Sequence, residues 1–178
     1  GWQEAIRRGM TQEPPSGQIK QHEPPLPRLV LLYRAEIEVA SPQLLGRTPA
    51  GERRIYPILG GRFDGERLRG RILPGGADWQ IVRETAEHVE MRVEARFTME
   101  TQDGALIYVQ NQGIRRAAPE QVRRMMGGET VDPAGYYFRM TPRFETGDPR
   151  YDWLNGVMAV ASGMRGPASV AYDVYAVE

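Results

Sequence analysis

The segment Leu-Pro-Gly-Gly-Ala-Asp-Trp-Gln at positions 73–80 combines a tight turn with a carboxylic acid and an indole. Asp78 would act as a general base or hydrogen-bond anchor if the fold buries it, because burial raises the pKa of a carboxyl group toward neutrality. The alternative is that Asp78 caps the turn through its own backbone. Trp79 is either a pocket wall or part of the core. We take Asp78 as a candidate catalytic residue and Trp79 as a candidate substrate-binding residue.

A second candidate segment spans residues 136–146, where side chains of two kinds alternate. One face of an extended chain would carry Tyr136, Phe138, Met140 and Phe144. The other would carry Tyr137, Arg139, Thr141, Arg143 and Glu145. If the polar face turns inward, the planar guanidinium of Arg139 can hold a carboxylate or an enolate. If it turns outward, it is a solvated face. Arg139 is therefore the second candidate catalytic residue.

Aromatic residues with a polar tip suit the rim of a ligand pocket, because their bodies are apolar. Residues 151–155 place Tyr151, Trp153 and Asn155 just before an expected strand. Polar side chains on other expected strands could reach the same cavity. The full set of candidate substrate-binding residues is Trp79, Tyr33, Tyr108, Asn111, Tyr151, Trp153 and Asn155.

Standard catalytic and cofactor motifs are not visible in this sequence. The pairs Gly60-Gly61 and Gly75-Gly76 lack the residues or the strand-to-helix context of nucleotide-binding loops. No Gly-x-Ser-x-Gly motif occurs. The chain has no cysteine and only two histidines, His22 and His88, which excludes thiolate sites and a metal centre built on several histidines. We therefore expect no metal and no cofactor.

The charge balance bears on partners and location. Acidic residues and basic residues number 23 each, so no net field draws the chain to nucleic acid or to an anionic membrane. No run of 18 apolar residues exists that could span a membrane, and no signal peptide is visible at the N-terminus. The lack of cysteine fits a reducing compartment. These features predict a cytoplasmic protein with no nucleic-acid or membrane partner.

The elements that must position these residues have a period of two. At 88–99 the apolar residues alternate strictly with polar ones, and they are Val89, Met91, Val93, Ala95, Phe97 and Met99. A strand places all six on one side, whereas a helix would scatter them. Residues 29–39 show a similar alternation. The pair Asp103-Gly104 predicts a hairpin between the 88–99 strand and a strand at 105–111.

Further strands are expected at 54–59, 68–73, 79–84, 136–144, 157–162 and 170–177. One helix is expected from Pro119 to Met126, because Pro opens it and Gly127-Gly128 ends it. It either closes one end of the fold or simply packs on the core.

Many strands joined by glycine-rich turns predict a sandwich or a barrel, and closure is favoured because it removes exposed strand edges. We predict an all-β fold, an antiparallel β-barrel of about 8–10 strands with one short helix capping an end. The 178 residues fit one domain. It would comprise residues 29–178, preceded by a Pro-rich N-terminal arm at 1–28.

Several motifs occur in order along this domain: Pro-x-x-Gly-Gly-x-Phe-x-Gly at 57–65, the 73–80 segment, Asp-Gly-Ala-Leu-Ile-Tyr-Val at 103–109, Tyr-Tyr-Phe-Arg at 136–139, and Phe-Glu-Thr-Gly at 144–147 with Trp-Leu-Asn at 153–155. Together they resemble the domain-of-unknown-function family 3237, also called uncharacterised protein family 0311, over about residues 29–178. The resemblance implies a compact antiparallel barrel found in bacterial and fungal proteins. Turns explain the shared glycines. Folding alone does not readily explain Asp78, Trp79, Arg139, Tyr151, Trp153 and Asn155.

These observations lead to three hypotheses. The first is a cofactor-independent enzyme that performs isomerase, cyclase or lyase-type acid–base chemistry on a small oxygenated, partly apolar metabolite, such as an unsaturated carbonyl, a lactone or a polyketide-like intermediate. Asp78 would move the proton, and Arg139 would steady the developing oxyanion. The alternative is a non-catalytic, lipocalin-like ligand carrier or sensor. The third is a structural module whose barrel is filled. A homodimer is compatible with all three.

Overall fold

The computed structural model describes Glu4 and residues 22–178. Most of the expected Pro-rich arm at 1–28 therefore lies outside the described residues. Its last part, from His22 to Arg28, is exposed and has no regular secondary structure. Among the described residues, no helix is long and apolar enough to cross a membrane.

Residues 22–178 form ten strands, one α-helix and two 3-10 helices. In chain order these are β1 (Leu29–Val39), β2 (Gln43–Thr48), β3 (Gly51–Asp64), β4 (Arg69–Ile72), β5 (Ala77–Glu84), β6 (Val89–Thr101), β7 (Leu106–Ala117), α2 (Pro119–Met126), η1 (Pro133–Gly135), β8 (Tyr137–Glu145), η2 (Pro149–Gly156), β9 (Ala159–Arg165) and β10 (Ser169–Val177).

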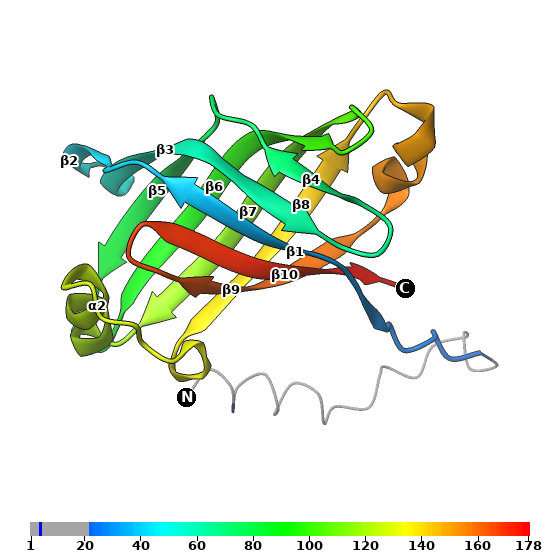
Figure 1. The fold of residues 1–178 in the computed structure, drawn as a ribbon. Coiled ribbons are helices and arrows are strands. Elements are labelled where there is room, and N and C mark those ends of the chain that lie inside the picture. Colours follow the sequence, from blue (N-terminus) through cyan, green and yellow to red (C-terminus); the bar gives the residue numbers. More distant parts are fainter. Residues whose placement is uncertain (1–3, 5–21) are drawn as a thin grey trace.

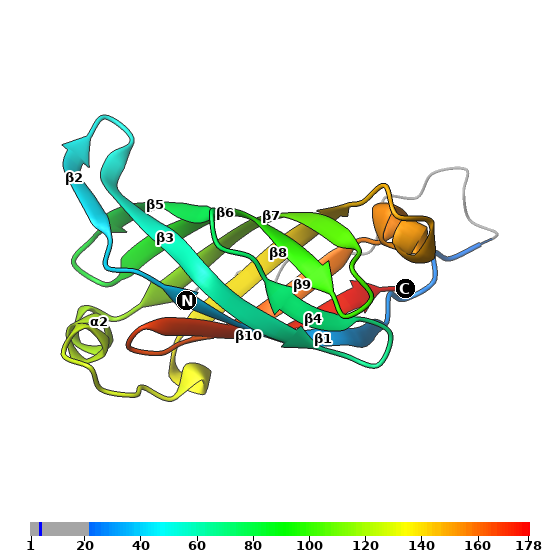
Figure 2. The same ribbon diagram turned by 45° about the horizontal axis from the view of Figure 1, so that its top comes forward.

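The strands close into an antiparallel barrel (Figure 1). Neighbours in sequence pair from β5 through β10, and β1 closes the circle by pairing with both β10 and β3. Because β4 and β5 both lie between β3 and β6, together they fill one position, and the barrel has eight positions. The strand β2 pairs only with β3 and projects from the barrel (Figure 2). The prediction of a closed antiparallel barrel is confirmed.

The two-residue alternation sets which side chains form the interior. In β6, the six buried residues are Val89, Met91, Ala95, Phe97, Met99 and Thr101. The predicted Asp103-Gly104 hairpin joins β6 to β7 in continuous register. Gly104 has a φ of 87°, a left-handed conformation that glycine adopts without steric cost.

One expectation for β1 is wrong in detail. Alternation predicted that Leu29 and Leu31 share the buried face, but they are 59% and 55% exposed. The pairing of β1 with β10 shifts register between Leu31 and Tyr33. This bulge reverses which residues face inward, so the buried alternation begins only at Tyr33.

The two ends of the barrel differ. At one end the interior is filled, and Tyr33 makes edge-on ring contacts with Phe63 at 5.6 Å and with Phe144 at 6.2 Å. The helix η2 lies at this end, and its Leu154 is fully buried. The other end carries α2 and the β9–β10 turn (Figure 1). The predicted helix at 119–126 is confirmed, and it has no fully buried residue.

Candidate functional site

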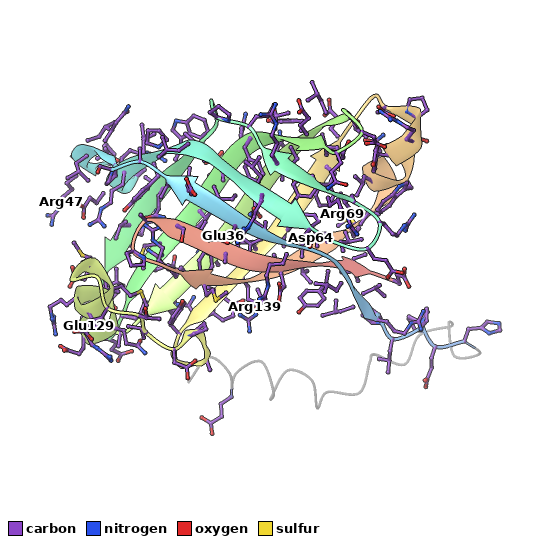
Figure 3. The ribbon with its side chains drawn as sticks, viewed as in Figure 1. Glu36, Arg47, Asp64, Arg69, Glu129 and Arg139 are labelled. Carbon is purple, nitrogen blue, oxygen red and sulfur yellow. The ribbon has the colours of Figure 1, made fainter. Side chains whose placement is uncertain are left out.

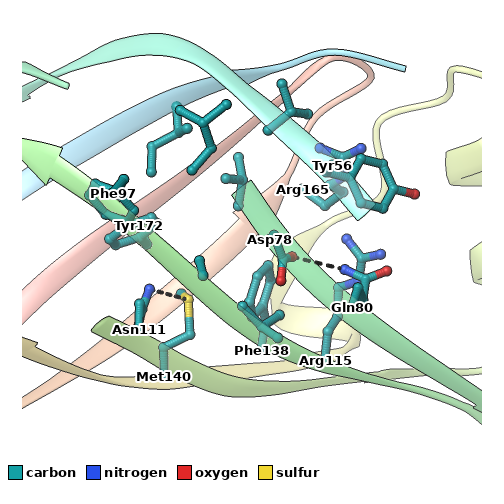
Figure 4. A pocket seen from close by; sticks show the side chains of 16 residues that line it. Tyr56, Asp78, Gln80, Phe97, Asn111, Arg115, Phe138, Met140, Arg165 and Tyr172 are labelled. Atoms are coloured by element: carbon teal, nitrogen blue, oxygen red, sulfur yellow. Dashed lines mark hydrogen bonds between the residues drawn. The ribbon is translucent and has the colours of Figure 1, made fainter. Parts of the chain in front are cut away.

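A cavity opens inside the barrel in the half that carries α2. The cavity volume is about 50 Å³, and the total empty space is about 540 Å³ when the opening to solvent is included. This is room for more than one water molecule. The apolar residues that line it are Ile37, Val39, Ile58, Val93, Ala95, Phe97, Phe138, Met140 and Val170. The polar residues are Tyr56, Asp78, Gln80, Asn111, Arg115, Arg165 and Tyr172 (Figure 4).

Alternation along five strands, β3, β5, β7, β9 and β10, brings the polar groups into this cavity. Asp78 and Gln80 are two residues apart on β5, so both point inward. Asn111 and Arg115 lie four apart on β7, which gives them the same face. Arg165 stands at the end of β9, where the strand reaches the opening.

The Asp78 carboxyl group is held in a fixed position. Its Oδ1 accepts a hydrogen bond from the backbone N–H of Glu94 at 3.0 Å, and its Oδ2 accepts one from Gln80 Nε2 at 3.2 Å. Burial raises the pKa of Asp78 from 3.8 to about 6, although these hydrogen bonds and the charges of Arg115 and Arg165 act in the opposite direction. A carboxyl group with this pKa can both accept and donate a proton near neutral pH.

Arg115 is a buried cation with weak partners. Its side chain is 9% exposed, and its Nε and Nη2 donate to Met91 Sδ at 3.2 and 2.7 Å. A thioether sulfur is only a weak acceptor. Burial, and after it the charge of Arg165, lowers the pKa of Arg115 to about 10. The guanidinium nevertheless remains charged at neutral pH.

The second guanidinium, that of Arg165, lies nearer the opening. Its Nη1 donates to the carbonyl oxygen of Ser169 at 3.1 Å, and its guanidinium carbon lies 5.5 Å from the centre of the Tyr56 ring. Cation–ring contact of this kind orients the side chain without neutralising it.

Two buried amide oxygens in the cavity have no hydrogen-bond partner: Gln80 Oε1 and Asn111 Oδ1. Asn111 is 2% exposed, and its Nδ2 donates to Met140 Sδ at 3.2 Å. Leaving a buried carbonyl oxygen unsatisfied is unfavourable by about 1–3 kcal/mol. Tyr172 lies beside Asn111, and burial raises the pKa of its phenol above the usual value, so it stays a neutral donor. These groups could bind a hydrogen-bonding ligand.

Two of the nine candidates from sequence, Asp78 and Asn111, line this cavity. The other candidate catalytic residue, Arg139, does not, and its expected role beside Asp78 is therefore corrected. Arg139 lies on the outer face of β8, where its Nη1 donates to the carbonyl oxygen of Phe138 (Figure 3). The apolar face of β8, with Phe138 and Met140, is the one that turns inward.

Trp79 also points away from the cavity, and it is 38% exposed. Adjacent residues of a strand point to opposite faces, so Trp79 and Asp78 cannot share a pocket inside the barrel. Tyr108 is likewise directed outward, and its hydroxyl accepts a hydrogen bond from Gln110 Nε2 at 3.0 Å. Tyr33 points inward, but into the filled half of the barrel.

The three candidates in η2 hold the filled end together instead. The Tyr151 hydroxyl donates to Asp103 Oδ1 at 2.9 Å. The Arg67 guanidinium lies 3.7 Å above the Trp153 ring. Asn155 bridges both backbone groups of Thr146, at 2.8 Å to its N–H and 2.9 Å to its carbonyl. Structural contacts therefore account for these side chains.

Sequence reasoning missed five polar residues of the cavity, which are Tyr56, Gln80, Arg115, Arg165 and Tyr172. A usable signal existed for Arg115. Ile107, Val109 and Asn111 alternate as inward residues, and the same alternation continued for four more positions reaches Arg115. The strand was expected to end at residue 111, but it continues to Ala117.

Metal ligands do not gather in the described part of the chain. No group of three or more His, Cys, Asp or Glu side chains there could hold a metal ion. The polar residues of the cavity are instead guanidinium, carboxyl, amide and phenol groups.

The fold and the site define a class: an eight-stranded closed antiparallel barrel with a polar group set in one half of its interior. The chain belongs to the DUF3237 family, described as a protein of unknown function, whose model matches residues 27–177. A UPF0311 protein of Rhodopseudomonas palustris is 48% identical over 132 residues, which is 74% of this chain and 84% of the relative.

Two solved structures place the fold among known ones. A β-barrel-like protein of Acinetobacter baumannii is 43% identical with a TM-score of 0.77, covering 89% of this chain and all of that one. A structure described as an enzyme from Penicillium herquei has a TM-score of 0.60 at 20% identity, covering 88% of this chain and 98% of that one. The latter likeness shows a shared fold.

Proposed function

We propose that this protein is a small-molecule-binding β-barrel that acts as a cofactor-independent enzyme, catalysing proton transfer on a small oxygenated, partly apolar metabolite. The observation that carries the proposal is the juxtaposition of Asp78 with the Arg115 and Arg165 guanidinium groups in one largely apolar cavity. Isomerisation through an enolate is the reaction that fits these groups best.

The acid–base step belongs to Asp78. As the carboxylate it removes a proton from the carbon beside a carbonyl group, and as the acid it returns that proton to another carbon of the same molecule. A pKa of about 6 suits both halves of this cycle, because a catalytic group works best when its pKa lies near the working pH. The apolar walls exclude water, which would otherwise compete for the proton.

Arg115 stabilises the negative charge that develops during the reaction. When the proton leaves carbon, negative charge develops on the carbonyl oxygen, and a fixed guanidinium in a buried site stabilises that charge strongly. Arg115 thus takes the role that the sequence had suggested for Arg139. That a barrel of this shape also occurs in the Penicillium herquei enzyme is consistent with catalysis on this fold.

The alternative is a carrier or sensor of the lipocalin type, favoured by the nine apolar residues of the lining. A carrier of apolar ligands has no need for a buried carboxyl and two guanidiniums, which are unfavourable to desolvate. We therefore rank catalysis above transport.

Isomerisation of two β,γ-unsaturated carbonyl compounds, 3-cyclohexen-1-one and α-angelica lactone, tests the proposal. Each gains a conjugated double bond when one proton leaves the α carbon and one arrives at the γ carbon, and absorbance follows the product. Wild type should accelerate at least one conversion. Asp78→Asn should slow it by about 10²–10⁴-fold, the usual share of a general base.

The matched control is Asp64→Asn, because Asp64 is an exposed carboxylate outside the barrel (Figure 3). It should leave the rate unchanged. A wild-type rate in Asp78→Asn would remove Asp78 from the mechanism. Binding of both compounds without any conversion would favour the carrier.

A further inference from the structure

The charges of the cavity do not balance. Two guanidinium groups, Arg115 and Arg165, face one carboxyl group, Asp78, which burial keeps partly protonated near neutral pH. The two cations also act on each other, since the charge of Arg165 lowers the pKa of Arg115. Like charges placed together in a buried site are unfavourable until an anion joins them.

Several arginines on the outside of this barrel pair with carboxylates, whereas others, such as Arg53 and Arg139, donate only to backbone carbonyl oxygens. Arg34 forms a bidentate ion pair with Asp173, at 2.6 and 2.8 Å. Arg62 and Arg71 likewise pair with glutamates, at 2.8 and 3.0 Å. Within the described residues, the two cavity arginines form no ion pair with a carboxylate. Asp78 is thus the one carboxyl group among the described residues that line the cavity, and it forms no ion pair with either arginine.

A second unmet requirement lies deeper in the cavity. Asn111 Oδ1 is a buried acceptor without a donor, and Gln80 Oε1 is another. Apolar side chains such as Phe97 and Phe138 line the space around these polar groups (Figure 4). A ligand that completes this site must bring an anion for the arginines, an apolar body, and a hydrogen-bond donor for Asn111.

Resting on the proposed function, we infer that the ligand is a hydroxylated organic carboxylate: its carboxylate binds between Arg115 and Arg165, and its hydroxyl donates to Asn111 Oδ1. A planar guanidinium pairs with a carboxylate through two parallel hydrogen bonds. A single negative charge matches the excess of one guanidinium over one carboxyl better than the double charge of a phosphate ester does. Because Arg115 Nε and Nη2 already donate to Met91 Sδ, one Nη1 N–H group is left for the oxyanion of the reaction.

Calorimetric titration with four probes tests this inference: 4-hydroxybenzoate, benzoate, methyl 4-hydroxybenzoate and phenyl phosphate. They share one ring and differ in charge or in the hydroxyl group. Wild type should bind 4-hydroxybenzoate at least about tenfold more tightly than its methyl ester, as expected for a charge-assisted pair. It should also prefer 4-hydroxybenzoate to benzoate and to phenyl phosphate.

Two substitutions test which residue binds each end of the ligand. Arg165→Gln should abolish the preference for the acid over the ester. Asn111→Leu should abolish the preference for 4-hydroxybenzoate over benzoate but keep that for acid over ester. Arg139→Gln is the matched control, because its guanidinium lies outside the barrel, and it should bind as wild type does. Circular dichroism confirms that each variant is folded.

Three results would overturn the inference: ester bound as tightly as acid, phenyl phosphate bound more tightly than either acid, or neither acid bound at millimolar concentration. An effect of Arg139→Gln equal to that of Arg165→Gln would also do so. Asp78→Asn should still bind 4-hydroxybenzoate, since the acid pairs with the arginines. Binding of the acid without Asp78-dependent isomerisation would thus refute the proposed reaction alone. Asp78-dependent isomerisation without binding of the acid would refute this inference alone.

Discussion

A single carboxyl group dominates the electrostatics of the site. Asp78 ionises in a buried position, and its pKa rises from 3.8 to about 6 because burial disfavours its charged form. In the unfolded chain the same group has an ordinary pKa. Between these two values the native protein holds a proton that the unfolded chain has lost. Raising the pH through this window therefore favours unfolding.

The first prediction is that the stability of the native protein falls as the pH rises. From pH 4 to pH 7 the ionisation of Asp78 should lower the stability by about 2–3 kcal/mol, since each unit of pKa shift is worth ~1.4 kcal/mol. Asp78→Asn removes this contribution. The free energy of unfolding in urea, measured for both proteins at several pH values, should show the variant gaining on wild type by about 2–3 kcal/mol as pH rises. A constant difference would mean that Asp78 titrates normally.

Two asparagines give a second prediction, because the same substitution should act in opposite directions. Asn111→Leu removes a buried, unsatisfied oxygen and should stabilise the protein by about 1 kcal/mol. Asn155→Leu breaks the bridge to both backbone groups of Thr146 and should destabilise it by about 1–2 kcal/mol. Thermal unfolding measures both. Destabilisation by Asn111→Leu would show that this oxygen has a partner, such as an ordered water.

Only some residues of this site could be predicted from the sequence. Asp78 could be found because an acid after a Gly-Gly turn has few structural duties. Arg139 could not be placed, because its strand has a polar and an apolar face, and only the register of the closed barrel decides which face is inside. Arg115 could have been placed by continuing the alternation of β7. The η2 aromatics look like a pocket rim in sequence, but Tyr151 and Trp153 make structural contacts with Asp103 and Arg67.

At the scale of elements, the period of two was sufficient to predict most strands, and proline and glycine located α2. Strand lengths were harder to predict. The strand β7 was expected to end at Asn111 but continues to Ala117, through the polar residues Gln112, Arg115 and Arg116. Those side chains are tolerated because one of them enters the cavity and the others face outward.

The strand β9 gives the third prediction, because its inward residues Ala159, Ala161 and Gly163 are small. They leave room for Phe138 and Met140. A β-carbon at Gly163 would lie 2.8 Å from Met140 Cε and 3.0 Å from the Phe138 ring. Gly163→Ala should therefore push both side chains into the cavity, weaken binding of 4-hydroxybenzoate, and destabilise the fold by about 1–3 kcal/mol.

Gly147→Ala is the control for this substitution, since a β-carbon there meets no atom within 4 Å. It should change neither property. Calorimetry and thermal unfolding check the pair. Unchanged binding by Gly163→Ala would show that β9 does not shape the cavity.

The whole molecule combines a closed barrel with an unequal interior. Aromatic contacts and η2 fill one half, while the other half keeps a cavity with unbalanced charges. Filled and hollow halves within one barrel suggest a division between stability and function, since like charges placed together in a cavity are unfavourable for folding. The backbone hydrogen bonds that close the barrel around its eight strand positions offset this unfavourable free energy.

The last prediction concerns a strand that lies outside the closed barrel. The strand β2 pairs with β3 alone, and its Leu44 and Leu45 are 69% and 56% exposed. Its backbone amides should open locally, whereas those of β7, paired on both sides, should exchange only when the barrel unfolds. Hydrogen exchange followed by mass spectrometry should thus show residues 43–48 exchanging far faster than residues 106–117. Equal protection in dilute protein would contradict this prediction. Protection of β2 that rises with protein concentration would instead indicate that a second copy covers this edge.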